Sequence, residues 1–333
     1  MNELLIGLVC VMLSTNQVAA ASNLVAHTTG VALPVLDPND PVEKEYQKLL
    51  DEDDQAQTEV DTWIKADDAV TAELPGASST LLRSRIDRRF EPVIKGYEDF
   101  LLRHSDHARA RLAYGSFLND IGKEDEALVQ WEKARTLEPK NPAAWNNLAN
   151  HFSHRGPVKK SFEYFAKAIE LNPKEPVYYQ NLATCVFLFR KDAKEYYQLD
   201  DDQKVFRRAL GLYRQALKLD PENFALATDL AQTYYYLKPA PTEDKASAAE
   251  AESKLFDEGI AAWTDAQKRA HDNLEREGVY IHMARLSIAA KRFDDARKYL
   301  ASVKDASYDA LKKRLTRNIE EKSGAKAAPA EKP

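Results

Sequence analysis

Four histidines come nearest to the spacing of a metal site in this chain. His151 and His154 stand three positions apart, which places both imidazoles on one face of a helix, and His104 and His107 flank an expected turn. A structural zinc ion takes four ligands, and no cysteine, aspartate or glutamate completes a recognisable motif with either pair. We therefore interpret these histidines as solvated surface residues and expect no metal.

The rest of the sequence shows no pattern of an enzyme. The acidic run Asp51–Asp54 lacks the glycine and the spaced glutamate of a calcium loop, so we interpret it as an exposed helix face. Cys185 stands beside an apolar position, which favours a buried and unreactive thiol. The chain has no nucleophile elbow, zinc-protease motif, phosphate loop or dinucleotide fingerprint. We expect a protein that is not an enzyme and holds no cofactor.

The composition predicts an all-α fold. The 333 residues include only 11 glycines, and 30% of them are charged. Glycine is unfavourable inside helices, whereas the abundant Ala, Leu, Lys and Glu are good helix formers. The net charge of −6 comes without a basic stripe that could neutralise phosphates, so nucleic acid is not an expected partner.

The N-terminus has the pattern of an export signal. Leu4–Leu13 is a short apolar run, too short to span a bilayer comfortably. Small residues at Ala20 and Ala21 suit signal peptidase, although Glu3 stands where a signal normally carries Lys or Arg. We expect a signal peptide at 1–21, a flexible linker at 22–40 and an exported protein, periplasmic or secreted from a bacterial envelope. Retention of the segment as an uncleaved anchor stays open.

Cleavage would leave a mature chain with a single cysteine. Cys10 would be removed with the signal, so Cys185 has no partner for an internal disulfide. A core large enough to be stable without disulfides is expected from roughly 300 residues. We expect no membrane span in the mature chain, and the sequence leaves the oligomeric state open.

Five residues recur along the chain at a spacing of 34. Gly115, Ala127, Trp131, Ala134 and Pro139 are followed, one such period later, by Ala149, Ser161, Phe165, Ala168 and Pro173. Small side chains allow two antiparallel helices to approach closely, and the aromatic residue fills the space between neighbouring helix pairs. Proline follows the second helix, which it is unable to continue.

This pattern resembles the tetratricopeptide repeat family. The resemblance implies an α-solenoid of antiparallel helix pairs wound into a right-handed superhelix. It covers about 75–310, in about five repeats with insertions at 187–205 and 238–255. Residues 41–74 are expected to form capping helices with a polar outer face, and 311–333 the end of a helix and a disordered tail.

Three details of the irregular regions are also predicted. Thr80–Phe90 is expected to be the first helix of a degenerate repeat that ends near His107, with Pro92 kinking or dividing the helical segment. The insertion at 187–205 is expected to lengthen the first helix of its repeat. After a polar turn, Asp200 should cap the next helix, with Gln203 at its third position.

The resemblance implies that the first helix of each repeat lines a concave groove. The groove positions carried over include Ser116 and Asp120. The candidate site residues chosen among the groove positions are Arg109, Asn119, Asn146, Asn150, His154, Gln180, Thr184, Gln232, Tyr235 and Tyr236. Amide side chains donate and accept hydrogen bonds as a peptide backbone does, so such a row suits an extended chain.

A protein interaction scaffold that binds a partner protein or peptide is therefore the predicted function. Two alternatives stay open. One is a small-molecule or glycan site walled by the 187–205 insertion with Tyr196 and Tyr197, and the other is an accessory domain of an envelope enzyme complex. The polar groove residues could also be ordinary solvated side chains.

Overall fold

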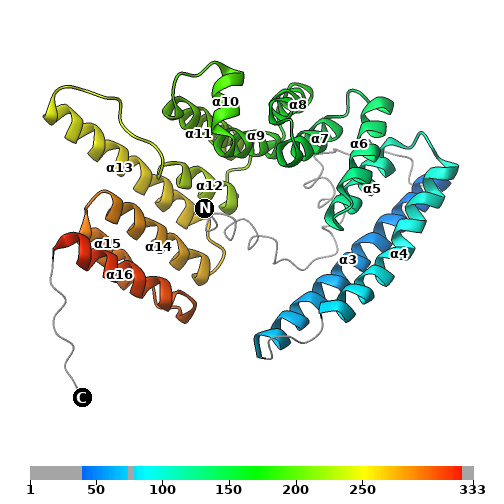
Figure 1. The fold of residues 1–333 in the computed structure, drawn as a ribbon, viewed down its shortest axis with the longest axis horizontal. Coiled ribbons are helices and arrows are strands. Elements are labelled where there is room, and N and C mark those ends of the chain that lie inside the picture. Colours follow the sequence, from blue (N-terminus) through cyan, green and yellow to red (C-terminus); the bar gives the residue numbers. More distant parts are fainter. Residues whose placement is uncertain (1–39, 74–78, 325–333) are drawn as a thin grey trace. The chain divides into compact units, whose positions relative to one another are not determined.

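The computed structural model describes residues 40–73 and 79–324. These residues form fourteen α-helices and one short 3-10 helix, and they contain no strand (Figure 1). The predicted all-α fold of antiparallel helix pairs is confirmed. The predicted signal peptide, nearly all of the predicted linker and the end of the predicted tail lie outside the described residues.

The described residues divide into two compact units on either side of Pro173. The N-terminal unit, residues 40–173, holds α3 (Pro41–Glu73), α4 (Ser79–Arg103), α5 (Ala108–Asp120), α6 (Glu124–Leu137), α7 (Pro142–Arg155) and α8 (Val158–Leu171). The C-terminal unit, residues 174–324, holds α9 (Pro176–Leu188), α10 (Arg190–Tyr197), α11 (Asp202–Leu219), α12 (Phe224–Thr233), α13 (Lys245–Lys268), α14 (Asn273–Ala289), α15 (Phe293–Ala301) and α16 (Asp309–Ser323).

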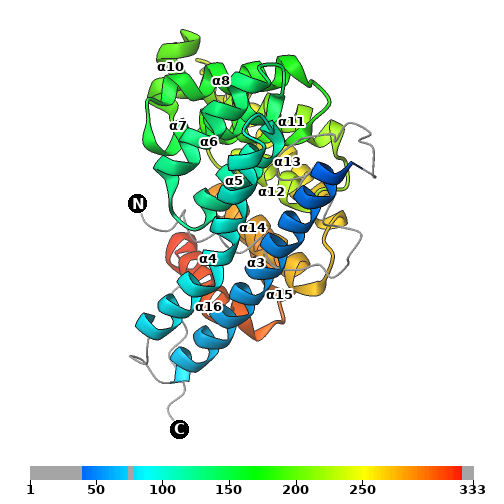
Figure 2. The ribbon, with the colours of Figure 1, turned by 90° about the vertical axis from the view of Figure 1, so that its right-hand side faces the viewer.

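The helices α3 and α4 form one long antiparallel hairpin, in which they lie side by side (Figures 1 and 2). Buried Tyr46, Val93, Tyr97 and Phe100 make its core. The region predicted as capping helices is therefore a single helix that pairs with α4.

The prediction that a degenerate repeat begins with a helix at Thr80–Phe90 is wrong. The helix α4 continues through Pro92 without a break. Pro92 lies on the exposed side of α4. Arg88, four positions earlier, is also exposed, so its carbonyl can bond to water instead of to the missing N–H of the proline.

The recurring pattern folds as predicted into the pairs α5/α6 and α7/α8. Gly115 lies against Trp131, since a Cβ placed on this glycine would stand 2.5 Å from the indole Nε1. The matching small residues Ala149 and Ser161 are completely buried, as Phe165 nearly is. The paired helices therefore approach closely at the small residues, and the aromatic residues fill the space beside them, as predicted.

In the C-terminal unit, the pairs α9/α11, α12/α13 and α14/α15 repeat this arrangement. The helix α16 then closes the series: its Leu315 and Ile319 are buried against Ile281, Ile288 and Leu300. A packed helix thus occupies most of the segment predicted as a helix end and disordered tail, and 325–333 lies outside the described residues.

The first insertion is a separate short helix and not a longer first helix. The helix α9 ends at Leu188, and α10 packs on α11 and α9. The cap of α11 is Asp201, whose carboxylate accepts a hydrogen bond from the Lys204 N–H at 2.8 Å. Asp200, the predicted cap, pairs with the Lys204 ammonium instead. Because Asp200, Asp201 and Asp202 are consecutive, the sequence alone does not show which of the three caps the helix.

The second insertion is confined to the segment between Thr233 and Lys245, because α13 is continuous from Lys245. Gln203 of α11 contacts this segment. Its amide donates to the Tyr236 carbonyl at 3.0 Å and accepts from the Lys238 N–H at 2.7 Å. Gln203 therefore links the two insertions, and its side chain does not help to cap α11 as its predicted third position suggested.

Asp201→Ala is expected to lower the free energy of unfolding by about 1 kcal/mol, because the first turn of α11 loses a side-chain acceptor. Asp200→Ala is the control: it removes only an exposed ion pair and should change stability by less than about 0.5 kcal/mol. Urea denaturation of both variants measures the difference. Equal losses, or a larger loss for Asp200→Ala, would show that Asp201 is not the cap.

Candidate functional site

A polar cavity of about 380 Å³ lies in the N-terminal unit, mainly between α5 and α7. We call it the polar groove. Its lining residues are Ser116, Asn119, Asp120, Glu124, Trp131, Asn147, Asn150, His151 and His154.

The repeat places these side chains in the groove. Ser116 and Asp120 of α5 stand one repeat period before Asn150 and His154 of α7, so the same two positions of consecutive repeats line it. Side chains at positions four apart share one face of a helix. The Gly115–Trp131 contact brings α6 close behind α5, and Trp131 also contributes to the groove wall.

Several polar atoms of the groove are available to a ligand. The side chains of Asn150 and His154 make no hydrogen bond with any residue that the structure describes. The Asn147 amide makes only long hydrogen bonds: it donates to Ser116 Oγ at 3.4 Å and accepts from Asn146 at 3.4 Å. Optimal bonds of this type are near 2.9 Å, so these are weak and open to exchange for a ligand.

The titratable groups in and beside the polar groove include the Asp120 carboxyl, the Glu124–Arg155 ion pair and the His151 imidazole. Burial raises the pKa of the Asp120 carboxyl, and a hydrogen bond from Asn119 opposes the rise. The Arg155 guanidinium holds the pKa of Glu124 below its usual value, so Glu124 is an anion at neutral pH. His151 is buried, so its interpretation as a solvated surface residue is wrong. Burial lowers the pKa of His151, which is therefore a neutral imidazole with one donor and one acceptor.

Of the predicted groove residues in this unit, the structure brings Asn119, Asn150 and His154 together in the polar groove. The other two lie elsewhere. The Arg109 guanidinium pairs with Glu43 and stands 5.2 Å from the centre of the Tyr46 ring, so it fastens α5 to α3. Asn146 is only 1% exposed and belongs to the interior.

The predicted residues of the C-terminal unit make internal contacts. Gln180 donates to the Asp229 carboxylate at 2.9 Å, and the Thr184 and Tyr213 hydroxyls are 2.9 Å apart. Burial raises the pKa of Asp229 to about 6, and the hydrogen bond from Gln180 opposes it. Gln232 is half-buried on α12. Gln180 and Thr184 thus join helices within the C-terminal unit.

Tyr235 and Tyr236 also take part in packing. The Tyr235 hydroxyl donates to the His282 carbonyl at 2.8 Å and lies 3.1 Å from the His282 Nδ1. The His282 ring stacks on Trp263, with 4.3 Å between ring centres, and burial lowers the pKa of His282 to about 4. The Tyr236 ring meets Phe187 edge-on with 5.0 Å between centres.

The insertion tyrosines are placed differently from each other. The Arg208 guanidinium covers the Tyr197 ring at 3.6 Å from its centre. Tyr196 is exposed beside it, and the two tyrosine rings meet at nearly a right angle. The helix α10 therefore packs on its own repeat through Tyr197.

The polar groove also contains Ser116 and Asp120, which the repeat pattern places at groove positions. They match Asn150 and His154 of the next repeat, so one spacing predicts all four. The groove residues that the pattern does not predict are Glu124, Trp131, Asn147 and His151. Glu124 belongs to the start of α6, just after the turn between helices, and no spacing within α5 or α7 points to it.

Within residues 40–73 and 79–324, no group of three or more His, Cys, Asp or Glu side chains gathers where a metal ion could be held. Every helix there is too short or too polar to cross a membrane. Cys185 is a buried free cysteine.

Comparison with known families identifies the repeat. Residues 125–176, from α6 to the start of α9, match the family model described as tetratricopeptide repeat. The match supports assignment to the tetratricopeptide repeat family. The spacing and burial of Trp131, Ala134, Ala149, Ser161 and Phe165 agree with this result.

Two relatives similar to this chain are photosystem I assembly proteins named Ycf3. The protein of Cyanophora paradoxa is 29% identical over 111 residues, which are 32% of this chain and 64% of that protein. The protein of Synechocystis is 35% identical over 107 residues, 31% of this chain and 61% of that protein. The chain thus covers less than two thirds of the length of either relative.

Among solved structures, the chain is similar to PilW, a type IV pilus biogenesis factor. The TM-score is 0.51 at 14% identity, and the alignment covers 71% of this chain and 94% of that one. At this identity the likeness shows the fold: a series of tetratricopeptide-type helix pairs.

Proposed function

We propose that this protein is an exported scaffold that binds an extended segment of a partner protein in the polar groove, and that it acts by binding and not by catalysis. Two kinds of observation support the proposal. The tetratricopeptide repeat is a fold built for interaction surfaces, and the names of the relatives describe assembly and biogenesis factors.

The observation that carries the proposal is the unused hydrogen-bonding capacity of the groove. Asn150 offers two donors and an acceptor, and the imidazole of His154 adds a ring N–H donor. A peptide backbone presents alternating N–H and C=O groups, which these side chains match without reading a particular sequence.

The charged residues of the polar groove indicate which net charge the bound segment has. Asp120 and Glu124 contribute carboxylates, and His151 is uncharged. An acidic segment would be repelled by these carboxylates, although the Arg155 guanidinium paired with Glu124 offsets part of the repulsion. We therefore propose that the bound segment is neutral or basic.

The binding test compares two double variants, one in the polar groove and one on the outer face of α6. Asn150→Ala/His154→Ala should weaken binding of the partner about tenfold, because each lost hydrogen bond is worth about 0.5 to 1.5 kcal/mol. The control Lys133→Ala/Thr136→Ala changes two exposed residues of α6 and should leave binding unchanged. The measurement is affinity of the purified variants for the partner captured by the wild-type chain. Undiminished binding by the groove variant would rule out this surface.

The export half of the proposal rests on Leu4–Leu13 and on the small residues at Ala20 and Ala21. N-terminal sequencing of the protein from the envelope of its native cells should give a chain beginning at Ala21 or Ser22. A membrane-bound chain with an intact N-terminus would identify an anchor instead. An intact chain in the cytoplasm would refute export.

A further inference from the structure

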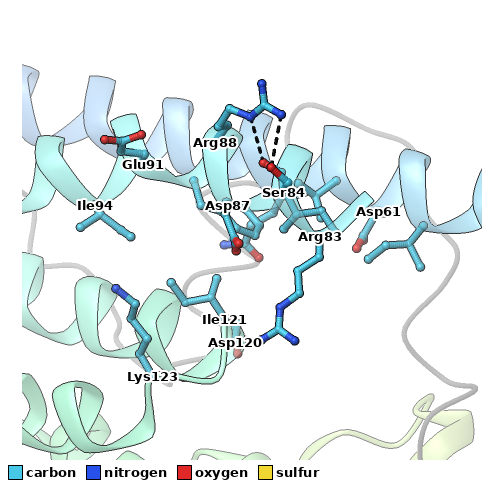
Figure 3. Close-up of a pocket in the computed structure, with 15 residues that line it drawn as sticks. Asp61, Arg83, Ser84, Asp87, Arg88, Glu91, Ile94, Asp120, Ile121 and Lys123 are labelled. Atoms are coloured by element: carbon cyan, nitrogen blue, oxygen red, sulfur yellow. Dashed lines mark hydrogen bonds between the residues drawn. The ribbon is translucent and has the colours of Figure 1, made fainter. Parts of the chain in front are cut away.

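A second cleft of the N-terminal unit lies beside the long hairpin, where α3 and α4 face the turn between α5 and α6 (Figure 3). Its volume is about 700 Å³. We call it the hairpin cleft. It is separate from the polar groove except for Asp120, which lines both.

The wall of the hairpin cleft has an apolar strip. Ile64 of α3, Phe90 and Ile94 of α4 and Ile121 of the turn form it, and each keeps part of its surface exposed. Ile64 keeps 38% of its surface exposed, although Tyr46, Leu49 and Val60 of the same helix are packed. Adjoining apolar side chains left in contact with water are typical of an interaction surface.

The rim of the hairpin cleft carries charges of both signs. The cations are Arg83, Arg88 and Lys123, and the anions are Asp61, Asp87, Glu91 and Asp120. None of these seven makes an ion pair with another residue that the structure describes. Arg88 bonds only to the hydroxyl and carbonyl oxygens of Ser84 (Figure 3).

The other charges of the hairpin behave differently. Across the α3–α4 contact, the Arg89 guanidinium pairs with Glu52 at 2.7 Å and with Glu59 at 2.8 Å. The hairpin therefore satisfies its charges where its two helices meet and leaves them unpaired around the hairpin cleft.

The lengths of the helices leave part of the hairpin without a neighbour in its own unit. The 33 residues of α3 extend about 50 Å, whereas the 13 residues of α5 extend about 20 Å. The end of the hairpin where α3 ends and α4 begins points away from α5 and α6 (Figure 1). Leu81 is 72% exposed on this part of α4.

We propose that the hairpin cleft is a self-association surface, which takes the α3/α4 hairpin of a second copy of this chain. A two-fold interface sets one surface patch against itself, so the patch must be complementary to itself. A nearly balanced rim around an apolar strip meets this condition. A partner of strong opposite charge would instead select a rim of one sign. Two hairpins packed together also make a four-helix arrangement, which buries apolar faces that one hairpin leaves open.

The first test measures the mass of the purified full chain by sedimentation equilibrium over the micromolar range. The chain should sediment as a dimer, and Ile64→Glu should weaken dimerisation at least about tenfold because it places a charge in the apolar strip. Leu102→Glu is the control: Leu102 is 82% exposed on α4 and does not line the cleft. Circular dichroism of both variants checks that the helices are retained.

The second test uses the balance of the rim charges. Arg83→Glu/Lys123→Glu makes the rim acidic, and Asp61→Lys/Asp87→Lys makes it basic. Each variant alone should be a monomer, and an equimolar mixture should regain the dimer, since the two rims are then complementary. A wild-type chain that is a monomer throughout, or a dimer that survives Ile64→Glu, would overturn the proposal. A mixture that stays monomeric would overturn it as well. These outcomes are independent of the polar groove.

Discussion

Gly115→Ala should lower the free energy of unfolding by about 2 kcal/mol, although alanine is the better helix former. The added Cβ would stand 2.5 and 2.6 Å from the Nε1 and Cδ1 atoms of Trp131. These are atoms of a rigid ring that is only 4% exposed, so the ring has little room to move. Overfilling of a packed core costs about 1 to 3 kcal/mol, and the gain in helix propensity of up to about 1 kcal/mol only partly offsets it.

A second helical glycine supplies the matched control. Gly211 lies within α11, and a Cβ added there would meet nothing within 4 Å. Gly211→Ala should therefore raise the free energy of unfolding by up to about 1 kcal/mol through helix propensity alone. Urea denaturation of both variants measures the two changes. Equal and favourable effects would mean that α5 and α6 do not approach closely at Gly115.

Asp53→Asn should raise the free energy of unfolding at neutral pH by about 2 kcal/mol. The prediction that Asp51–Asp54 form an exposed helix face is wrong for Asp53, which is buried in the hairpin. Its carboxylate accepts hydrogen bonds from the Tyr97 hydroxyl at 2.6 Å and from Gln57 at 2.7 Å. It has no ion pair with any residue that the structure describes. Asparagine keeps a carbonyl for Tyr97, the Gln57 amide can turn to accept, and the buried charge is removed.

The raised pKa of Asp53 determines how the stability of the fold changes with pH. Burial raises the pKa of Asp53 from 3.8 to about 6, against the opposing hydrogen bonds from Tyr97 and Gln57. A raised carboxyl pKa means that the folded chain binds the proton more tightly. Protonation therefore stabilises the fold fully below the unfolded value of 3.8, and this contribution is lost as the pH rises through about 6.

The variant and the wild-type chain should consequently be about equally stable near pH 4 and differ most above pH 7. Asp229 and His282 also titrate in this range, but they are the same in both chains and cancel in the difference. Thermal unfolding of both chains between pH 4 and 8 is the measurement. A difference that does not change with pH would show that Asp53 is not a buried anion.

The regular part of the fold could be predicted from the sequence because each repeat position has a steric reason. Gly115 opposite Trp131, followed one period later by Ala149 and Phe165, fits closely packed helix pairs and little else. The α3/α4 hairpin shows no such repeating pattern of small and aromatic residues, so the sequence does not predict it. Pro92 suggested a break, but an exposed proline with an exposed residue four positions earlier can be accommodated in a continuous helix.

Part of the candidate site could be predicted, because Asn119, Asn150 and His154 stand at groove positions of the repeat. Asn150 and His154 line the groove, and their side chains make no other hydrogen bond with the described residues. Arg109 was predicted to line the groove as well, but Glu43 of the distant helix α3 pairs with it. Gln180 similarly bonds to Asp229 of a later repeat. Such long-range partners follow from the tertiary structure and leave no periodic signal.

Binding in the polar groove is tested most directly by photo-crosslinking in the cells that produce the protein, because crosslinking reports which face of the repeat meets the partner. A photoreactive amino acid would replace Asn150 in the polar groove and, in a second strain, the exposed Lys133 of α6. Binding in the polar groove predicts a crosslinked partner at position 150 and none at position 133. A partner crosslinked at 133 and not at 150 would contradict it.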